Sequence, residues 1–246
     1  SKLHPTLRPP LDFFVTVMKA DHRRVDNLMI WLEHHVKATP ARMKTREGYQ
    51  LSHEPFEVQM KVWFKRGELP RRLECLLKKM RRLQISPTRL CLGFVAKSWI
   101  ARGRVEEAQR IVRKAGDVTL CNLVLQGWSR LRIQKAEDYF EWMCQKRLQP
   151  DQRSYEILFS ASNPQKACHV QYLLQHMEKQ IESGRLQYPT SKVYQLAIRA
   201  LTKASDKLCV LRLWHKFDSK LNSGKPSFEI NLVEEIFMRM RKANIV

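Results

Sequence analysis

Glycine is scarce in this sequence, which has only eight among 246 residues, and Val, Ile and Thr seldom alternate with polar residues. Both features argue against an all-β fold, because strands show alternating apolar residues bounded by turn residues. Long apolar runs are missing too, since no stretch approaches the roughly 18 uncharged apolar residues of a membrane helix. The sequence therefore predicts neither a β-sandwich nor a membrane-spanning protein.

The sequence also lacks the cysteine patterns of disulfide frameworks and zinc sites. None of its six cysteines forms a C-x-x-C pair, and each lies inside a helical pattern. We therefore expect reduced, buried thiols in an intracellular compartment. These residues are Cys75, Cys91, Cys121, Cys144, Cys168 and Cys209. The chain begins at Ser1 without a methionine or an apolar signal region, so we expect a removed leader or a start within a longer protein.

Acidic residues are few compared with basic ones. Lys and Arg number 45 against 24 Asp and Glu, which gives a formal net charge of +21 and a pI near 10.0. Such an imbalance costs self-repulsion unless a polyanion neutralises it, so nucleic acid is the expected partner. A membrane surface fits less well, because no helix pattern sets a clean basic face against an exposed apolar face.

Amphipathic helical patterns fill most of the chain. Between Asp117 and Asp151 the pattern predicts two helices back to back, at about 120–131 and 134–146, ended by Pro150-Asp151. Similar ends recur every ~30–40 residues, the period of helical-hairpin solenoids. They are Pro87-Thr88, Gly116-Asp117, Pro150-Asp151, Pro189-Thr190 and Pro226-Ser227.

The expected fold is all-α, an α-solenoid of stacked antiparallel helix-turn-helix repeats. One hairpin cannot bury its own apolar face, so each needs neighbours of the same kind. We expect a basic extended tail at 1–10, a degenerate helix pair at 11–37, a basic loop at 38–55 and a C-terminal capping helix at 226–246. Between them, at 56–225, we expect repeats at about 56–88, 89–117, 118–151, 152–190 and 191–225.

Two stretches carry a family resemblance. Residues 103–108 read GRVEEA, and residues 121–128 read CNLVLQGW, followed by Ala136, Phe140, Met143 and Pro150-Asp151. At these residues the chain resembles a pentatricopeptide repeat (PPR) protein, over about residues 56–221. Tetratricopeptide repeats are the main alternative, but their Trp-Leu-Gly-Tyr pattern and terminal proline are absent.

The resemblance implies that single-stranded RNA binds along the first helices, about one base per unit. In the family, the residue after the aromatic position and the last residue of the unit read the base. Here these pairs are Gly93 with Asp117, Asn122 with Asp151, Glu156 with Thr190, and Gln195 with Ser227. Only the Asn122 pair suits base reading, because Gly93 has no side chain and Glu156 would repel phosphate. A capping or turn role is the alternative for Asn122 and Asp151.

Basic clusters are the candidates for contact with an RNA backbone. Phosphate contacts give affinity and salt dependence but little sequence information. The alternative for each cluster is an ordinary solvated helix face. The candidates are Arg42, Lys44, Arg46, Lys78, Lys79, Arg81, Arg82, Arg102, Arg104, Arg110, Arg113, Lys114, Arg130, Arg132, Arg239, Arg241 and Lys242.

No motif in the sequence favours catalysis. There is no Ser/His/Asp or Cys/His set, no glycine-rich phosphate loop and no Asp-rich metallonuclease segment of the kind that some PPR proteins append. We therefore expect no enzyme activity, metal, cofactor or small-molecule substrate. The tryptophans at 63, 99, 128 and 214 lie at core spacing, so we expect them to pack between units rather than stack on bases.

The resemblance also implies an organelle, with the mitochondrial matrix favoured and the chloroplast as the alternative. Strong basicity, degenerate base readers and no enzymatic segment favour a structural component of the mitochondrial ribosome that contacts rRNA and neighbouring proteins. A free factor that stabilises, processes or helps edit one organellar mRNA is a second hypothesis. A solenoid scaffold for an acidic protein is a third.

Overall fold

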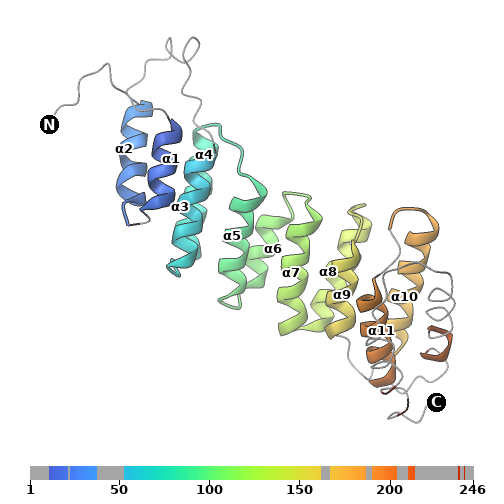
Figure 1. The fold of residues 1–246 in the computed structure, drawn as a ribbon. Coiled ribbons are helices and arrows are strands. Elements are labelled where there is room, and N and C mark those ends of the chain that lie inside the picture. Colours follow the sequence, from blue (N-terminus) through green and yellow to red (C-terminus); the bar gives the residue numbers. More distant parts are fainter. Residues whose placement is uncertain are drawn as a thin grey trace. The chain divides into compact units, whose positions relative to one another are not determined.

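In the computed structural model, the described residues are 11–21, 23–37, 53–161, 167–186, 190–203 and 210–213, with 238 and 241. Every regular element within them that carries a label is an α-helix (Figure 1). The helices are α1 (Leu11–Ala20), α2 (Val25–Lys37), α3 (Glu54–Lys65), α4 (Pro70–Arg82), α5 (Arg89–Ile100), α6 (Val105–Val112), α7 (Val118–Leu131), α8 (Ile133–Gln145), α9 (Gln152–Ala161), α10 (Ala167–Glu182) and α11 (Ser191–Lys203).

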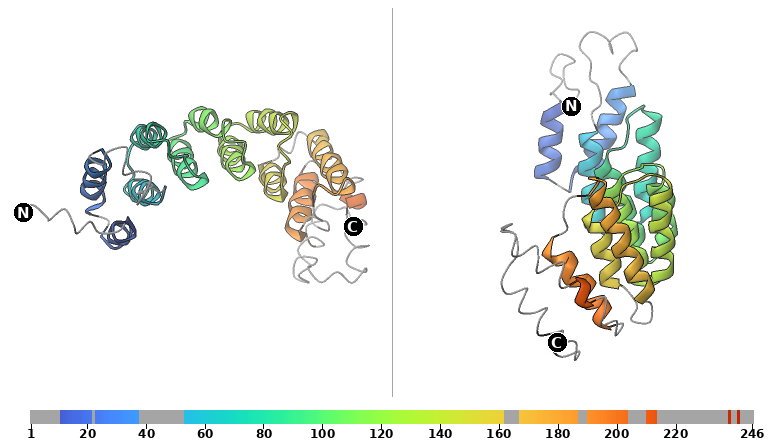
Figure 2. Two further views of the ribbon diagram at one scale, coloured as in Figure 1. Left: turned by 90° about the horizontal axis from the view of Figure 1, so that it is seen from above. Right: turned by 90° about the vertical axis from the view of Figure 1, so that its right-hand side faces the viewer.

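The chain divides into two compact units, Ser1–Ala115 with α1 to α6 and Gly116–Val246 with α7 to α11. In the first unit, α3 packs against both α1 and α5; in the second, α9 packs against both α7 and α11. The first helices of the hairpins thus form one row in each unit, and the second helices lie behind them (Figure 2). The fold is an α-solenoid of stacked helical hairpins, as the sequence predicts.

Local chemistry explains where several helices begin and end. The Thr88 hydroxyl accepts from the Cys91 amide at 3.4 Å, and the Asp117 carboxylate accepts from the Leu120 amide at 3.0 Å, so both cap a helix N-terminus. The turn between α5 and α6 depends on Gly103, whose φ of +72° disfavours other residues although an added Cβ would meet no atom within 4 Å. The α3 helix begins at Glu54, two residues before the expected start, because Pro55 suits a first helical turn.

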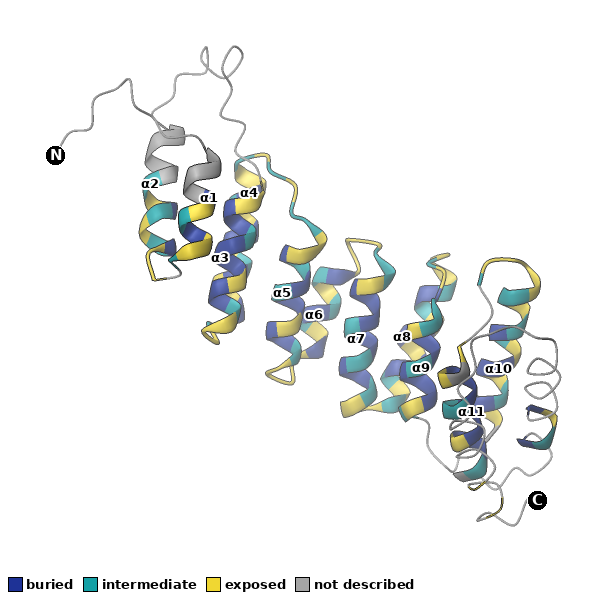
Figure 3. Cartoon of the chain, viewed as in Figure 1, coloured by how far each residue is buried: buried dark blue, intermediate teal, exposed yellow. Residues whose placement is uncertain are grey.

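The core of each unit lies where the helices face one another (Figure 3). Three tryptophans on first helices repeat one arrangement. Each is buried, at 8%, 5% and 3% exposure for Trp63, Trp99 and Trp128, which confirms the expected packing role. A cation from the following segment covers each ring. The pairs are Arg72 at 4.4 Å from the Trp63 ring, Arg104 at 5.3 Å from the Trp99 ring and Lys135 at 4.4 Å from the Trp128 ring.

Two of these indoles also connect successive hairpins of the first unit. The Trp63 Nε1–H donates to Asp26 Oδ1 on α2 at 2.6 Å, and the Trp99 Nε1–H donates to Glu74 Oε1 on α4 at 2.8 Å. Each indole therefore satisfies its one polar group on the preceding second helix while its ring fills the core.

The prediction of buried cysteines is wrong for two residues. Cys91 and Cys121 are buried and Cys144 is half-buried, but Cys75 on α4 and Cys168 on α10 are exposed. Both occupy helix positions that face away from the neighbouring hairpins, where a helical pattern alone does not require an apolar residue. Trp214, Cys209, the tail at 1–10, most of the loop at 38–55 and most of the helix expected near the C-terminus lie outside the described residues.

Candidate nucleic-acid interface

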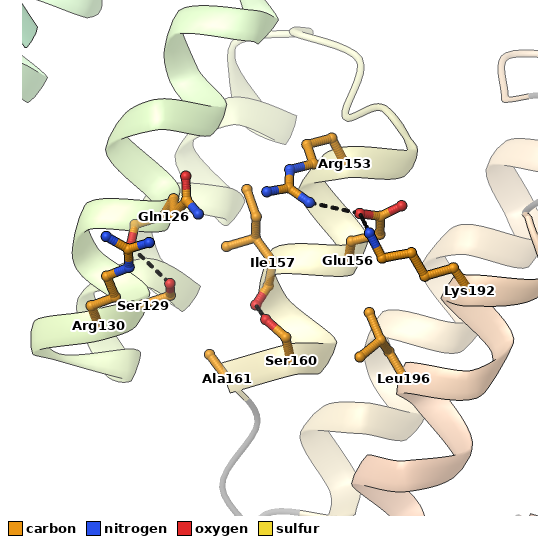
Figure 4. Close-up of a pocket in the computed structure, with 10 residues that line it drawn as sticks. All are labelled: Gln126, Ser129, Arg130, Arg153, Glu156, Ile157, Ser160, Ala161, Lys192 and Leu196. Carbon is orange, nitrogen blue, oxygen red and sulfur yellow. Dashed lines mark hydrogen bonds and ion pairs between the residues drawn. The ribbon is translucent and has the colours of Figure 1, made fainter. Parts of the chain in front are cut away.

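The first helices of the second unit line a groove of about 430 Å³, a volume within the usual range of ligand pockets. Three successive first helices contribute to it, so it follows the row rather than one hairpin (Figure 4). Its lining is Gln126, Ser129 and Arg130 from α7, Arg153, Glu156, Ile157, Ser160 and Ala161 from α9, and Lys192 and Leu196 from α11.

An ion-pair triad defines the electrostatics of this groove. Glu156 Oε2 lies 2.8 Å from Arg153 Nη1 and 3.3 Å from Lys192 Nζ, and both cations point toward it (Figure 4). The carboxylate is 14% exposed, whereas the two cations are 51% and 60% exposed. With Arg130, the groove holds three cations against one acid, so its charge is positive although Glu156 lies at its centre. The repulsion of phosphate expected from Glu156 is offset by these two cations.

The rest of the lining suits a sugar and a base. Ile157 and Leu196 supply apolar surface, and the Ser129 and Ser160 hydroxyls donate to the Gln126 and Ile157 carbonyls at 2.9 and 2.8 Å. Since each hydroxyl donates to its own helix, its lone pairs are directed outward as acceptors. The groove therefore combines cations for an anionic backbone with apolar and polar surface for the groups attached to it.

The base-reading candidates Asn122 and Asp151 meet at the start of α9. The Asn122 Nδ2–H donates to Asp151 Oδ1 at 2.8 Å, and the Ser154 hydroxyl donates to Asn122 Oδ1 at 2.7 Å. Asp151 Oδ1 also accepts from the Ser154 amide at 2.9 Å, so Asp151 caps α9. Asn122 is 5% exposed and Ser154 is fully buried. Both sides of the Asn122 amide are thus bonded inside the protein, which holds this pair in a fixed capping network.

Solved structures with a similar fold include two crystal structures of the pentatricopeptide repeat protein PPR10 in complex with an 18-nt psaJ RNA element, one of them a triple cysteine-to-serine variant. Each matches with a TM-score of 0.50 and 18% sequence identity, over 98% of this chain and 40% of the PPR10 chain. The chain has a PPR-like fold. It spans about 40% of the length of those PPR10 chains. No family model matches the sequence, and no curated protein does.

The remaining base-reading candidates of the PPR-like units lie in different surroundings. Asp117 caps α7, as described above, and Gly93 is a buried position on α5. Thr190 is exposed directly before α11, whereas Gln195 is half-buried and engaged within the chain. Ser227 lies outside the described residues.

The first unit contains a counterpart of the Asn122–Asp151 pair, formed by Glu57 and Thr88. The sequence patterns did not predict this second pair. The Thr88 hydroxyl donates to Glu57 Oε1 at 2.5 Å while it caps α5. The bond again joins a residue near the start of a first helix to the residue just before the next first helix. In both units, these positions are connected by a hydrogen bond between side chains.

Several of the phosphate-contact candidates bind groups within the protein. The Arg102 guanidinium donates to the Gly67 carbonyl at 2.9 Å and to the Ser98 hydroxyl at 3.2 Å, which fastens the turn after α3. Arg104 and Arg110 pair with Glu107 at 3.4 and 3.0 Å. Lys79 and Arg113 also interact within the chain. Arg102, Arg104, Arg110 and Arg113 are exposed despite these contacts, and the other exposed candidates are Lys78, Arg81, Arg82, Lys114, Arg130, Arg132 and Arg241. Arg42, Lys44, Arg46, Arg239 and Lys242 lie outside the described residues.

Most residues of the groove escaped the sequence analysis, which named only Arg130 and Glu156 among them. A signal for two of the others was present, because Gln126 and Ser160 follow the reading positions 122 and 156 by four residues, one helical turn. Arg153 and Lys192 offered no comparable pattern, since their pairing with Glu156 depends on how α9 and α11 pack.

A second polar cluster in this unit also joins residues that no motif connected. His176 on α10 forms a hydrogen bond through each ring nitrogen. Its Nε2 lies 3.7 Å from Cys144 Sγ, and its Nδ1 lies 2.8 Å from Tyr155 Oη. Burial raises the pKa of the Cys144 thiol to about 11, and burial lowers the pKa of His176. Near neutral pH the thiol and the imidazole are therefore both uncharged, which is the opposite of an activated thiolate–imidazolium pair.

Metal and membrane features are not found in the part of the chain that the structure describes. No group of three or more His, Cys, Asp or Glu residues there has the arrangement of a metal site. In the same residues, no helix combines the length and the apolar character needed to cross a bilayer.

Proposed function

We propose that this protein binds RNA through the first-helix face of its PPR-like units, and that the groove between α7, α9 and α11 holds part of a single strand. The observation that carries the proposal is the placing of Arg130, Arg153 and Lys192 around one groove on that face. An RNA phosphate can take the place of the Glu156 carboxylate as the partner of Arg153 and Lys192. The solved PPR10 complexes, which share the fold, contain RNA.

Net charge supports the same partner. A formal charge of +21 on 246 residues repels itself in the free protein, and a polyanion relieves that repulsion. Affinity would then depend mainly on phosphate contacts, because the Asn122 amide is already bonded on both sides. Such a binder holds RNA with little sequence preference from this unit.

A finer proposal follows from this weak base reading. A protein that holds RNA by its backbone suits a permanent place in a ribonucleoprotein, and we propose the mitochondrial ribosome, with rRNA and neighbouring proteins as its contacts. Sedimentation of a mitochondrial lysate tests this assignment. The protein should run with one ribosomal subunit after mild lysis, and a position in the light fractions would contradict it.

Substitution of groove cations tests RNA binding itself. We expect the double variant Arg130→Gln/Lys192→Gln to bind a single-stranded RNA at least about ten-fold more weakly, with a salt slope lower by about 1.4, because each phosphate contact contributes about 0.7 on a single strand. The measurement is fluorescence anisotropy over a range of salt concentrations. The matched control is Lys146→Gln/Lys179→Gln, which removes two exposed cations at the end of α8 and on α10, second helices that do not line the groove. Equal losses in both variants would show that only overall charge matters.

A further inference from the structure

The α4 helix carries the densest positive charge of any described helix. Its 13 residues include six cations and one acid. The apolar side of α4 is fully used by the core, since Leu73, Leu76, Leu77 and Met80 are buried. The exposed positions therefore form a separate surface. We name the residues Arg71, Cys75, Lys78 and Arg82, all exposed, the α4 stripe.

Helical geometry places the stripe on one line. Its members are spaced by four, three and four residues, the spacing of one helix face. With a rise of 1.5 Å per residue, the stripe from Arg71 to Arg82 is about 16 Å long. Its three cations make no ion pair with any of the described residues, and Arg81 beside them makes none either. The stripe is thus a straight, rigid row of cations available to a partner.

Helix stability does not account for this row. The partial positive charge of a helix N-terminus disfavours cations, yet α4 has no acid in its first turn and carries both Arg71 and Arg72 there. Arg72 is compensated by Glu68 at 2.9 Å and by the Trp63 ring. Among the residues that the structure describes, none compensates Arg71 in this way. Arg81 and Arg82 suit the C-terminal end of the dipole, but Arg71 and the mid-helix Lys78 do not serve it.

We propose that the α4 stripe is a second RNA-binding surface, which takes the phosphate backbone of double-stranded RNA. Duplex RNA is recognised mainly through its backbone and shape, so a row of cations suffices without base contacts. A single strand would call for stacking surfaces, and the stripe contains no aromatic side chain. The proposal is independent of the groove in the second unit, because the two surfaces share no residue.

An acidic protein and a membrane fit this surface less well. Protein interfaces depend on buried aromatic and aliphatic anchors, whereas the stripe offers only cations and one thiol. A membrane-bound helix needs an exposed apolar face. On α4 that face is buried in the core. Charge complementarity without anchors is the pattern of backbone recognition.

Salt-dependent binding of a duplex tests the proposal. The probe is a blunt RNA duplex of about 16 base pairs, the span of a double-stranded RNA-binding domain, beside a single strand of the same length. For Arg71→Gln/Lys78→Gln/Arg82→Gln we expect the salt slope on the duplex to fall by about 2.7, with about 0.9 for each lost phosphate contact as on a DNA duplex. Between about 50 and 200 mM salt, wild type should then lose about 40-fold more affinity than the variant. Single-strand binding should change less than about two-fold.

The control variant removes the same charge elsewhere. Lys146→Gln/Lys179→Gln/Arg185→Gln replaces three exposed cations of the second unit and should bind the duplex like wild type. Equal weakening in the two triple variants would overturn the proposal, as would unchanged duplex binding in the α4 variant. If wild type binds the single strand but no duplex, this inference fails and the proposed function stands. Tight duplex binding without single-strand binding supports the inference and contradicts the groove.

The exposed cysteines provide a direct footprint. Cys75 lies within the stripe and Cys168 lies on α10, so alkylation of both can be followed by mass spectrometry in one sample. Bound duplex should slow the alkylation of Cys75 several-fold and leave Cys168 unchanged. A poly-glutamate peptide that protects Cys75 as well as the duplex does would identify a surface for acidic proteins and overturn the proposal.

Discussion

Two hairpins of this protein share a core and differ on the outside. In α3/α4 and in α7/α8, a buried tryptophan on the first helix lies under a cation of the second helix, with Arg72 and Lys135 both 4.4 Å from the ring. The two second helices differ in charge, because α4 holds six cations and one acid whereas α8 holds one cation and three acids. The core positions thus fix the hairpin, and the second-helix surface is free to take a charge of either sign.

The largest effect should come from the shared core. We expect Trp63→Ala and Trp128→Ala each to lower the free energy of unfolding by about 3–5 kcal/mol, because each leaves a large cavity beneath its cation. Urea denaturation followed by circular dichroism measures both. Similar losses would support the idea that the two hairpins use the same core, whereas a loss below about 1 kcal/mol in either would contradict it.

The capping bonds that join first helices should differ in strength. Ser154→Ala leaves Asn122 Oδ1 buried without its donor, so we expect a loss of about 1–3 kcal/mol. Thr88→Ala removes the hydroxyl that bonds Glu57 on α3, but this bond is only partly buried, and the expected loss is about 1 kcal/mol. Thermal unfolding of the two variants ranks them. A larger loss for Thr88→Ala would contradict this difference between the units.

A pH effect should arise from His176 in the second unit. Burial lowers the pKa of His176, with Lys179 adding to the effect, among Cys144, Tyr155 and Tyr172. The unfolded chain therefore binds a proton at a higher pH than the folded chain does. The contribution of neutral His176 to the free energy of unfolding is therefore fully present above the unfolded pKa near 6.5. It is lost as the pH falls toward and through the lower pKa of the folded chain.

The variant His176→Gln tests this effect, since glutamine can keep a hydrogen bond to Tyr155 and cannot be protonated in this range. Between pH 7.5 and 5, we expect the urea midpoint of wild type to fall more steeply than that of the variant. Parallel curves for the two proteins would show that other groups cause the acid sensitivity. The effect should be smaller than the losses above, because it concerns the protonation of one partly buried group.

The sequence predicted the helices and the tryptophan core because helical periodicity records which residues face inward. It could not predict the groove, since Glu156 meets Lys192 only through the packing of α9 on α11. It also could not separate structural cations from available ones. Arg102 and Lys78 look alike in the sequence, yet Arg102 binds the Gly67 carbonyl and Lys78 faces solvent. Whether a long cationic side chain is structural or available depends on its contacts with the neighbouring hairpin, and a local sequence pattern does not show those contacts.

The smallest expected effect bears most directly on the outer faces. If Arg71 serves a partner and not its own helix, Arg71→Gln should raise the free energy of unfolding by about 0.3–1 kcal/mol, because it removes an unfavourable charge from the N-terminus of α4. Lys78→Gln is the matched control, since a mid-helix position lies outside the reach of the dipole and should leave stability unchanged. Both variants should weaken duplex binding by a similar factor. A loss of stability on Arg71→Gln would show that this arginine supports the fold, and the contrast between the outer faces of α4 and α8 would then be structural in origin.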